Sequence, residues 1–228
     1  MNDNTIRIFP LGDSALTVEF GQWISPDLNR VAIALSTYLD KNPFPGYVES
    51  VPAYASTTIF YDLITVRRQF SDSETAFASV RRHLLNVLPS VSDHLDDSGR
   101  NCDIPVHFDK DSALDLDYLA EASGLSAKEV IEIFTASTYR VFMLGFLPGF
   151  TYMGEVDPRI ATPRRTSPRL EVPKGSVGIA GNQTGIYSLK SPGGWQIIGR
   201  TDIEMFRPTS HEPTFLQPGD MVRFVPAK

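Results

Sequence analysis

The sequence contains one cysteine, no long apolar run and no excess of positive charge, and each of these features excludes a class of protein. Because Cys102 is the single cysteine, an intramolecular disulfide framework and a cysteine-based zinc site are excluded, and a reducing cytoplasm is the expected location. No run of about 18 apolar residues occurs, and the N-terminus lacks a basic segment followed by an apolar one. We therefore predict neither secretion nor a membrane span.

Charge and motifs narrow the function further. The net charge of -6 argues against general binding to nucleic acids or anionic membranes, because basic surface drives both. The sequence has no phosphate-binding P-loop, no dinucleotide fingerprint, no zinc-protease motif and no nucleophile elbow. The four histidines lack metal-ligand spacing, so no metal site is expected, and we expect His83 and His94 to be solvated.

The first ninety residues alternate between strand and helix patterns. Two short strands are predicted around a turn at residues 10–13, and a helix from Pro26, capped by Ser25, to about Pro43. A β-rich stretch follows at residues 50–62. A second helix is predicted from about residue 71, with buried residues at helical spacing: Phe77, Val80, Leu84, Leu85 and Val87 or Leu88. Residues 1–90 are therefore predicted to form a small α+β domain.

The polar segment 91–102 is the predicted linker to a second domain, residues 103–228. A strand at 104–108 precedes two helices interrupted at Gly124, the second capped by Ser126 with Glu129 in the capping-box position. From Tyr139 onward, short apolar runs alternate with glycine and proline turns. This pattern is typical of a compact β-barrel or sandwich.

Ten of the sixteen glycines and six of the seventeen prolines lie between residues 145 and 200. Gly175, Gly178 and Gly181 have two interpretations: they allow tight turns and close strand packing, or they expose backbone amides to an anion. Either interpretation makes Gly178 intolerant of a side chain. Phe146 and Phe150 are expected to anchor a turn in the core.

The segment 163–200 is also strongly basic, with six cationic residues against the single acid Glu171. Arg164, Arg165 and Arg169 form either a solvated face or, because prolines separate them, a fixed loop suited to carboxylate or phosphate recognition. Trp195, Tyr187 and Gln183 follow, and each suits either packing or a substrate pocket.

Five ordered motifs resemble the allophanate hydrolase subunit 1 family: GFLPGFTY at 145–152, PRRTSPR at 163–169, VPKGSVGIAG at 172–181, QTGIY at 183–187 and SPGGWQIIGRT at 191–201. The resemblance implies an α+β fold with a small N-terminal α+β domain and a C-terminal cyclophilin-like β-barrel. The chain departs from the family at residues 107–111, where a CYGGE-like segment is frequent, and at Phe134, where a histidine is frequent.

The resemblance also implies a function. The family includes the B-type component of an ATP-dependent 5-oxoprolinase, which acts with a C-like companion subunit and a third, A-like protein to hydrolyse 5-oxo-L-proline to L-glutamate. It also includes an inhibitor of a sensor histidine kinase, which is the alternative function, and barrel shape alone suggests a weaker third one, peptidyl-prolyl isomerase. The implied substrate-binding residues are Arg169, Lys174, Gln183, Tyr187 and Trp195, with backbone at Gly178 and Gly181. No catalytic residue and no ATP site is identified.

Overall fold

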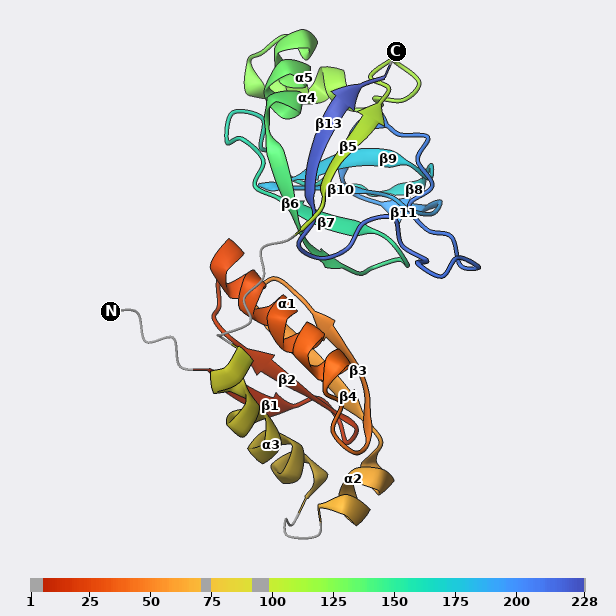
Figure 1. The fold of residues 1–228 in the computed structure, drawn as a ribbon. Helices are drawn as coiled ribbons and strands as arrows, with labels where there is room; N and C mark the ends of the chain where they lie inside the picture. Colours follow the sequence, from red (N-terminus) through yellow and green to blue (C-terminus); the bar gives the residue numbers. More distant parts are fainter. Residues whose placement is uncertain (1–5, 71–74, 92–98, 228) are drawn as a thin grey trace, which may run out of the picture. The chain divides into compact units, whose positions relative to one another are not determined.

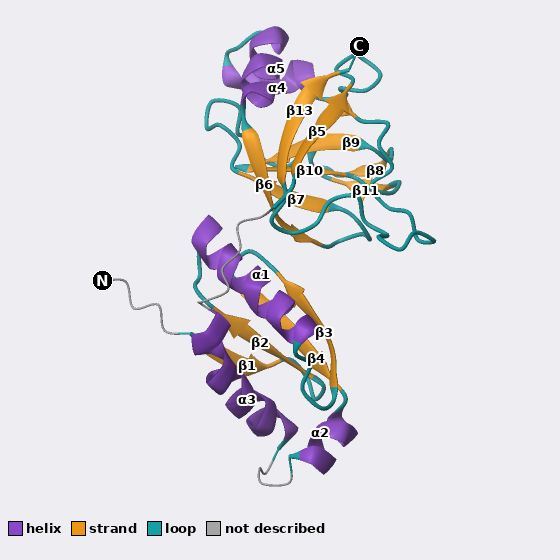
Figure 2. Ribbon diagram, viewed as in Figure 1, coloured by secondary structure: helices purple, strands orange, loops and turns teal. Residues whose placement is uncertain are grey.

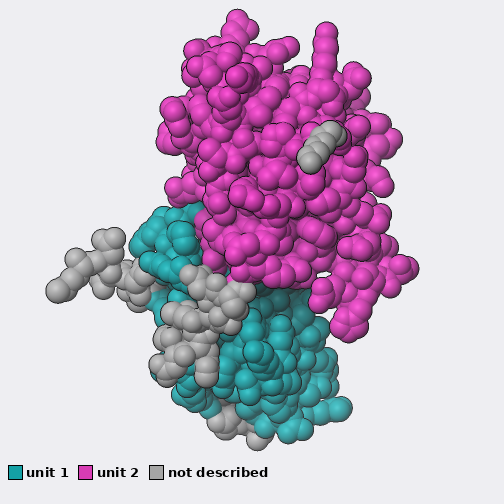
Figure 3. Space-filling view, turned by 45° about the horizontal axis from the view of Figure 1, so that its top comes forward, with its two compact units in different colours: residues 1–98 teal, residues 99–228 magenta. Residues whose placement is uncertain are grey.

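The computed structural model describes residues 6–70, 75–91 and 99–227 and contains two compact units, residues 1–98 and 99–228 (Figure 3). The predicted linker falls largely outside the described residues. Its first residue ends a helix at Val91, and its last two residues, 101 and 102, belong to a strand of the second unit. Among the described residues, no helix combines the length and the apolar composition that crossing a bilayer requires.

The first unit is a four-stranded antiparallel sheet in the order β1-β2-β4-β3 (Figure 1). The strands are β1 (Arg7–Pro10), β2 (Ala15–Glu19), β3 (Tyr47–Pro52) and β4 (Ser56–Tyr61). Three helices accompany it: α1 (Pro26–Lys41), α2 (Leu63–Gln69) and α3 (Ala76–Val91). The predicted order of two strands, a helix, a β stretch and a helix is confirmed, but the β stretch forms two strands, β3 and β4, and α2 is an addition that the sequence pattern did not indicate.

The core of the first unit lies between the sheet and the helices α1 and α3. Leu16 and Ile59 are directly paired across β2 and β4 and are fully buried in one cluster with apolar residues of both helices. Two predictions fail here. Leu85 is 44% exposed, and His83 contacts the rings of Phe44 and Phe70 at centroid distances of 5.2 and 6.5 Å. His94 lies outside the described residues.

The second unit contains a seven-stranded sheet in the order β12-β9-β10-β7-β6-β13-β5 (Figure 2). All neighbours are antiparallel except β13 and β5, which are parallel. The strands are β5 (Asn101–Val106), β6 (Thr138–Leu144), β7 (Thr151–Gly154), β9 (Ser176–Ala180), β10 (Gln183–Ile186), β12 (Gln196–Arg200) and β13 (Met221–Pro226). A separate ribbon pairs β8 (Arg169–Val172) with β11 (Ser191–Gly193).

Two backbone hydrogen bonds join the outermost strands of this sheet. The amide of His107 donates to the carbonyl of Arg200 at 2.8 Å, and the amide of Arg200 donates to the carbonyl of His107 at 3.0 Å. His107 follows β5 and Arg200 ends β12, so the contact brings the two ends of the strand order together. The sheet therefore curls into the predicted barrel.

Helices α4 (Leu116–Ser123) and α5 (Ala127–Ala136) pack on this barrel. Gly124 ends α4 in the left-handed conformation, and Ser126 with Glu129 forms the predicted capping box of α5. Phe134 of α5 is buried and stacks on Phe224 of β13 at a centroid distance of 4.8 Å. At this position, where the family frequently has a histidine, the residue is part of the apolar core.

Candidate functional site

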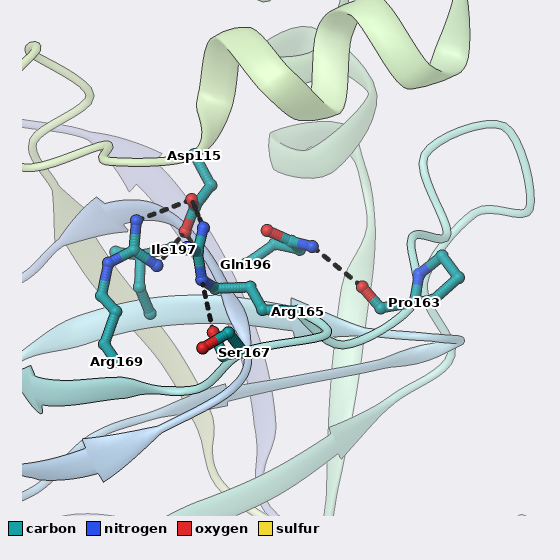
Figure 4. Close-up of polar contacts among 7 residues, drawn as sticks. All are labelled: Asp115, Pro163, Arg165, Ser167, Arg169, Gln196 and Ile197. Carbon is teal, nitrogen blue, oxygen red and sulfur yellow. Dashed lines mark hydrogen bonds and ion pairs between the residues drawn. The ribbon is translucent and has the colours of Figure 1, made fainter.

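The cationic loop at residues 163–169, here called the arginine loop, is held to the barrel by one buried carboxylate (Figure 4). Arg169 donates from both terminal nitrogens to Asp115, with N–O distances of 2.7 Å. Arg165 donates to Asp115 Oδ1 at 2.9 Å. Bidentate pairing of this kind fixes the plane of the guanidinium group as well as its position. Arg169 is therefore committed to an internal carboxylate rather than free to hold a ligand.

Asp115 precedes α4 but makes no side-chain cap for that helix. Its Oδ2 instead accepts a hydrogen bond from the backbone N–H of Ile197 in β12 at 2.7 Å. The carboxylate is only 3% exposed, and a buried charge is stable only when it is paired and hydrogen-bonded. Asp115 thus connects three segments that are far apart in sequence: α4, the arginine loop and β12.

Further contacts hold the backbone of the arginine loop. The amide of Arg165 donates to the carbonyl of Gly194 at 2.7 Å, and the side chain of Gln196 donates to the carbonyl of Pro163 at 3.0 Å. The Nε of Arg165 reaches the carbonyl of Ser167 at 3.3 Å. Of the two interpretations of this segment, the fixed loop fits the structure better than a solvated face.

A compact aromatic cluster lies beside the loop. Trp195, Tyr187 and Tyr152 surround Phe150, each in an edge-to-face arrangement, with centroid distances to Phe150 of 5.5, 5.1 and 4.8 Å. Arg164 is exposed, and its guanidinium carbon lies 5.8 Å from the centroid of the Trp195 ring. Aromatic rings attract cations over their faces, so Trp195 both packs in the cluster and supports a surface cation.

The hydroxyl groups of the cluster are held in the protonated form. Burial raises the pKa of Tyr187 above its ordinary value, with a smaller opposing effect of a hydrogen bond from the Trp195 backbone. Burial also raises the pKa of Tyr152, and the nearby Arg164 opposes that shift. Both tyrosines are therefore hydrogen-bond donors at neutral pH rather than bases.

The charge of this region is unbalanced. Arg165 and Arg169 share one buried acid, Asp115, and among the described residues no carboxylate forms an ion pair with Arg164. Two positive charges therefore remain at the edge of the aromatic cluster. Such a surface attracts small anions and can hold a carboxylate through the charge-assisted N–H groups that Asp115 leaves unused.

The structure places Lys174 apart from the arginine loop. It lies beyond the far end of β8, and it lines a cavity of about 250 Å³ with residues of the segment 200–204. Neither Arg169 nor Trp195 lines that cavity. The cavity therefore separates Lys174 from Arg169 and Trp195, whereas Tyr187, Trp195 and Gly178 lie together.

Gly178 and Gly181 fit the packing interpretation. Gly178 is buried in the middle of β9, paired with Gly185 of β10 and Ile197 of β12, and a Cβ added there would lie 3.0 Å from the Cβ of Trp195. Gly181 has a positive φ of 61°, and its amide donates to the carbonyl of Thr162 at 2.8 Å. Neither glycine presents the bare amide that an anion site requires.

Gln183 and the phenylalanine pair complete the predicted residues. Gln183 begins β10 opposite Gly154, at the end of the strand away from Tyr187. Phe150 is buried as expected, but Phe146 is 61% exposed and has a φ of 64°, so it does not anchor the turn in the core. Among the described residues, no group of three or more histidine, cysteine or acidic side chains is placed to hold a metal ion.

Sequence reasoning missed Asp115. Its partners are 50 and 54 residues away, and in sequence it reads as one of several acids before an amphipathic helix. An aspartate at a helix start is ordinarily a cap. Only the tertiary structure shows that its carboxylate is used elsewhere.

Comparisons with known proteins agree over nearly the whole chain. The family described as carboxyltransferase domain, subdomain C and D, matches residues 6–216. The chain is 42% identical to the B subunit of 5-oxoprolinase from Bacillus subtilis (strain 168), with 96% of this chain and 92% of that protein covered. It is 41% identical to the protein of the same name from Escherichia coli O157:H7, covering 97% and 96%. The identity to the 5-oxoprolinase B subunit of Haemophilus influenzae is 43%, with 96% of this chain and 97% of that protein covered.

Solved structures show the same fold. The crystal structure of TTHA0988 aligns with a TM-score of 0.78 and 36% identity over 94% of this chain, which spans only 39% of the TTHA0988 chain. The uncharacterized protein PH0987 from Pyrococcus horikoshii aligns with a TM-score of 0.56 and 41% identity, covering 97% of this chain and 98% of that one.

Proposed function

The chain belongs to the family of carboxyltransferase subdomains C and D, and we propose that it is the B subunit of an ATP-dependent 5-oxoprolinase. The observation that carries the proposal is the identity of 41–43% to three proteins of that name over almost their whole length. In this function the chain takes part in the hydrolysis of the lactam C–N bond of 5-oxo-L-proline, which yields L-glutamate.

The arginine loop and the aromatic cluster are the proposed contribution of this chain to the site. 5-Oxo-L-proline has one carboxylate and a small ring. Arg164 and the free N–H groups of Arg165 suit the carboxylate, and the partly exposed Tyr152, backed by the buried Trp195, suits the ring. Asp115 and Arg169 position this loop, and Tyr187 holds Trp195. This revises the expectation that Arg169 and Lys174 together hold the substrate.

The reacting groups would come from companion subunits. In the described part of the chain, the arginine loop is surrounded by cations, packed aromatic rings and neutral tyrosines, which are poor nucleophiles and bases. We therefore propose that the isolated chain is inactive and that a C-like subunit completes the site. TTHA0988 has a chain more than twice the matched length, which is compatible with a fused companion domain.

ATP use belongs to the assembled complex in this proposal. The chain has no nucleotide-binding motif, so an A-like third protein or the companion subunit would bind ATP and couple its hydrolysis to ring opening. The cytoplasm, where ATP and reduced cysteine occur together, remains the predicted location.

Reconstitution tests the proposal. The chain is purified alone, with each companion subunit and with both, and L-glutamate release from 5-oxo-L-proline is measured with and without ATP. We expect activity only in the full set with ATP. Activity of the chain alone would contradict its role as a dependent subunit, and an inactive full set would contradict the proposed reaction.

The histidine-kinase inhibitor remains the alternative prediction. It requires binding to the dimerisation helices of a sensor kinase, which a pull-down with the purified chain measures directly. Kinase binding at micromolar concentration, together with an inactive reconstituted set, would favour this alternative.

A further inference from the structure

The cavity that contains Lys174 is formed where two chain segments cross closely. The amide of Thr201 donates to the carbonyl of Gly175 at 2.9 Å, and a Cβ added to Gly175 would lie only 2.1 Å from the carbonyl oxygen of Thr201. This close approach places the segment 173–175 beside the segment 200–204. The hollow between them has a volume of about 250 Å³.

The charged residues that line the cavity are of both signs. Lys174 and Arg200 supply two cations, and Asp202 and Glu204 supply two carboxylates. Asp202 has a partner, because its Oδ2 lies 3.0 Å from Nε2 of His107. Within the described residues, Lys174, Arg200 and Glu204 form no ion pair with one another or with any other side chain.

Lys174 and Glu204 are exposed and Arg200 is partly buried, and because an exposed ion pair gains little, these charges remain open to a ligand. Lys174 lies on one segment of the cavity and Arg200 on the other, and neither forms an ion pair with Glu204. The short polar side chains of the wall are already engaged: Ser188 Oγ donates to the carbonyl of Pro148 at 2.6 Å, and Thr201 Oγ1 accepts from the amide of Ile203 at 3.2 Å. Lys174, Arg200 and Glu204 are thus the polar side chains of the cavity that form no ion pair among the described residues, and they are left to bind a ligand.

We propose that this cavity binds a small zwitterion, an α-amino acid. Lys174 and Arg200 would hold the carboxylate, and Glu204, with Asp202 beside it, would hold the ammonium group. The ammonium and the carboxylate of the ligand would each meet an opposite charge. A ligand with both groups is therefore favoured over a ligand with only one of them. Charge-assisted hydrogen bonds to both ends give such a ligand its orientation.

Net charge and size argue for the same class. Because two cations and two carboxylates balance, the lining offers no excess positive charge to a nucleotide or another polyanion. The volume of about 250 Å³ is below the roughly 300–1,000 Å³ of pockets for drug-sized ligands. It suits a molecule of the size of an amino acid. The site is distinct from the arginine loop, whose charge is positive and which favours a simple anion.

The proposal does not depend on the proposed function, but it gives that function a consequence. L-glutamate, the amino acid that the proposed reaction releases, is a zwitterion at its α-carbon, whereas 5-oxo-L-proline has no ammonium group. The cavity would therefore distinguish product from substrate, and the two molecules form a matched pair of probes.

The test is an NMR titration of the full chain with L-glutamate, 5-oxo-L-proline and glutarate, which lacks the ammonium group. We expect L-glutamate to shift the amide signals of residues 173–175 and 200–204, with at least about tenfold weaker binding of the two other ligands, because each lacks a charge-assisted contact. Lys174→Met and Glu204→Gln should each weaken L-glutamate binding about tenfold or more. Lys190→Met is the control, because Lys190 is exposed and pairs with Glu171 outside the cavity.

Three results would overturn the proposal: no shift at these residues, shifts that survive both substitutions, or equal binding of glutarate. Strong binding of 5-oxo-L-proline here, lost in Lys174→Met, would identify the cavity as a substrate site instead. None of these results bears on glutamate release by the reconstituted complex, so failure of the amino-acid site and failure of the proposed reaction are distinguished.

Discussion

Arg169 binds Asp115 through both of its terminal nitrogens, each 2.7 Å from a carboxylate oxygen. Removing one member of a buried ion pair costs about 3–5 kcal/mol because the other charge is left unpaired. For Asp115→Asn we expect a loss of about 2 kcal/mol in the free energy of unfolding, because Arg165 and Arg169 keep partial contact with water. Urea unfolding monitored by circular dichroism measures this loss in the free energy of unfolding.

Asp103→Asn is the matched control. Asp103 also pairs with an arginine, Arg223, at 2.6 Å, but both side chains are more than half exposed. Exposed ion pairs contribute little to stability, so this variant should unfold like the unmodified chain. Equal behaviour of the two variants would show that Asp115 does not hold the arginine loop.

Arg164 and Arg169 should separate function from stability. Arg164 is exposed and makes a cation–π contact with Trp195, so Arg164→Ala should cost at most about 1 kcal/mol of stability while lowering glutamate release by the reconstituted complex at least about tenfold. Arg169→Ala should lower stability as well, because it breaks the bidentate pair. If Arg164→Ala leaves the KM for 5-oxo-L-proline and kcat unchanged, the arginine loop does not bind the substrate.

Alanine substitutions at Gly178 and Gly181 should affect the stability of the protein in different ways. Gly178→Ala places a Cβ 3.0 Å from the Cβ of Trp195 and 3.3 Å from the side chain of Ile197, and overpacking of this kind costs about 1–3 kcal/mol. It should also change the fluorescence of Trp195. Gly181→Ala meets no atom within 4 Å and should cost about 1 kcal/mol through its positive φ alone, with unchanged fluorescence. The reverse order would contradict the packing interpretation.

Local sequence patterns predicted most elements of this fold. Ser25 before Pro26, the capping box at Ser126 and Glu129, and Gly124 after α4 are short-range signals, and each lies in the structure where it was expected. They are readable because the interactions that they report lie within a few residues. The barrel followed from alternating short apolar runs and turns together with the family motifs.

Long-range relationships could not be read in the same way. The closure between His107 and Arg200 uses backbone groups, which leave no trace in residue identity. Asp115 resembled a helix cap. Lys174 is five residues from Arg169 but does not lie beside it, because β8, which begins at Arg169, carries the chain from the arginine loop to the cavity. The predicted site joined residues of neighbouring motifs, but neighbours in sequence such as Arg169 and Lys174 lie apart when a strand runs between them.

Phe146 carries a backbone conformation that a side chain disfavours. Its φ is 64°, and its ring is exposed with an edge contact to Phe150 at 5.5 Å. The left-handed conformation costs a non-glycine residue about 1–2 kcal/mol. Phe146→Gly should therefore be more stable than Phe146→Ala by about 1 kcal/mol, measured by thermal unfolding. Equal stability of the two variants would mean that this turn relaxes to a negative φ.

The stability of the first unit should depend on pH through His83. Burial lowers the pKa of His83 below its ordinary 6.5, and among the described residues its Nε2 atom is buried without a hydrogen-bond partner. Below pH 6.5 the unfolded chain therefore binds more protons than the folded one. The free energy of unfolding then falls as the pH drops from 6.5 through the lowered pKa, and it levels off below that value.

His83→Phe removes this proton while keeping a ring between Phe44 and Phe70. Urea unfolding between pH 5 and 7 should then show a weaker pH dependence than in the unmodified chain. His211→Gln is the control, because His211 is exposed and its removal should leave the dependence unchanged. If His83→Phe retains the full dependence, another group on the first unit binds the proton, because only a group whose pKa differs between the folded and unfolded states links stability to pH.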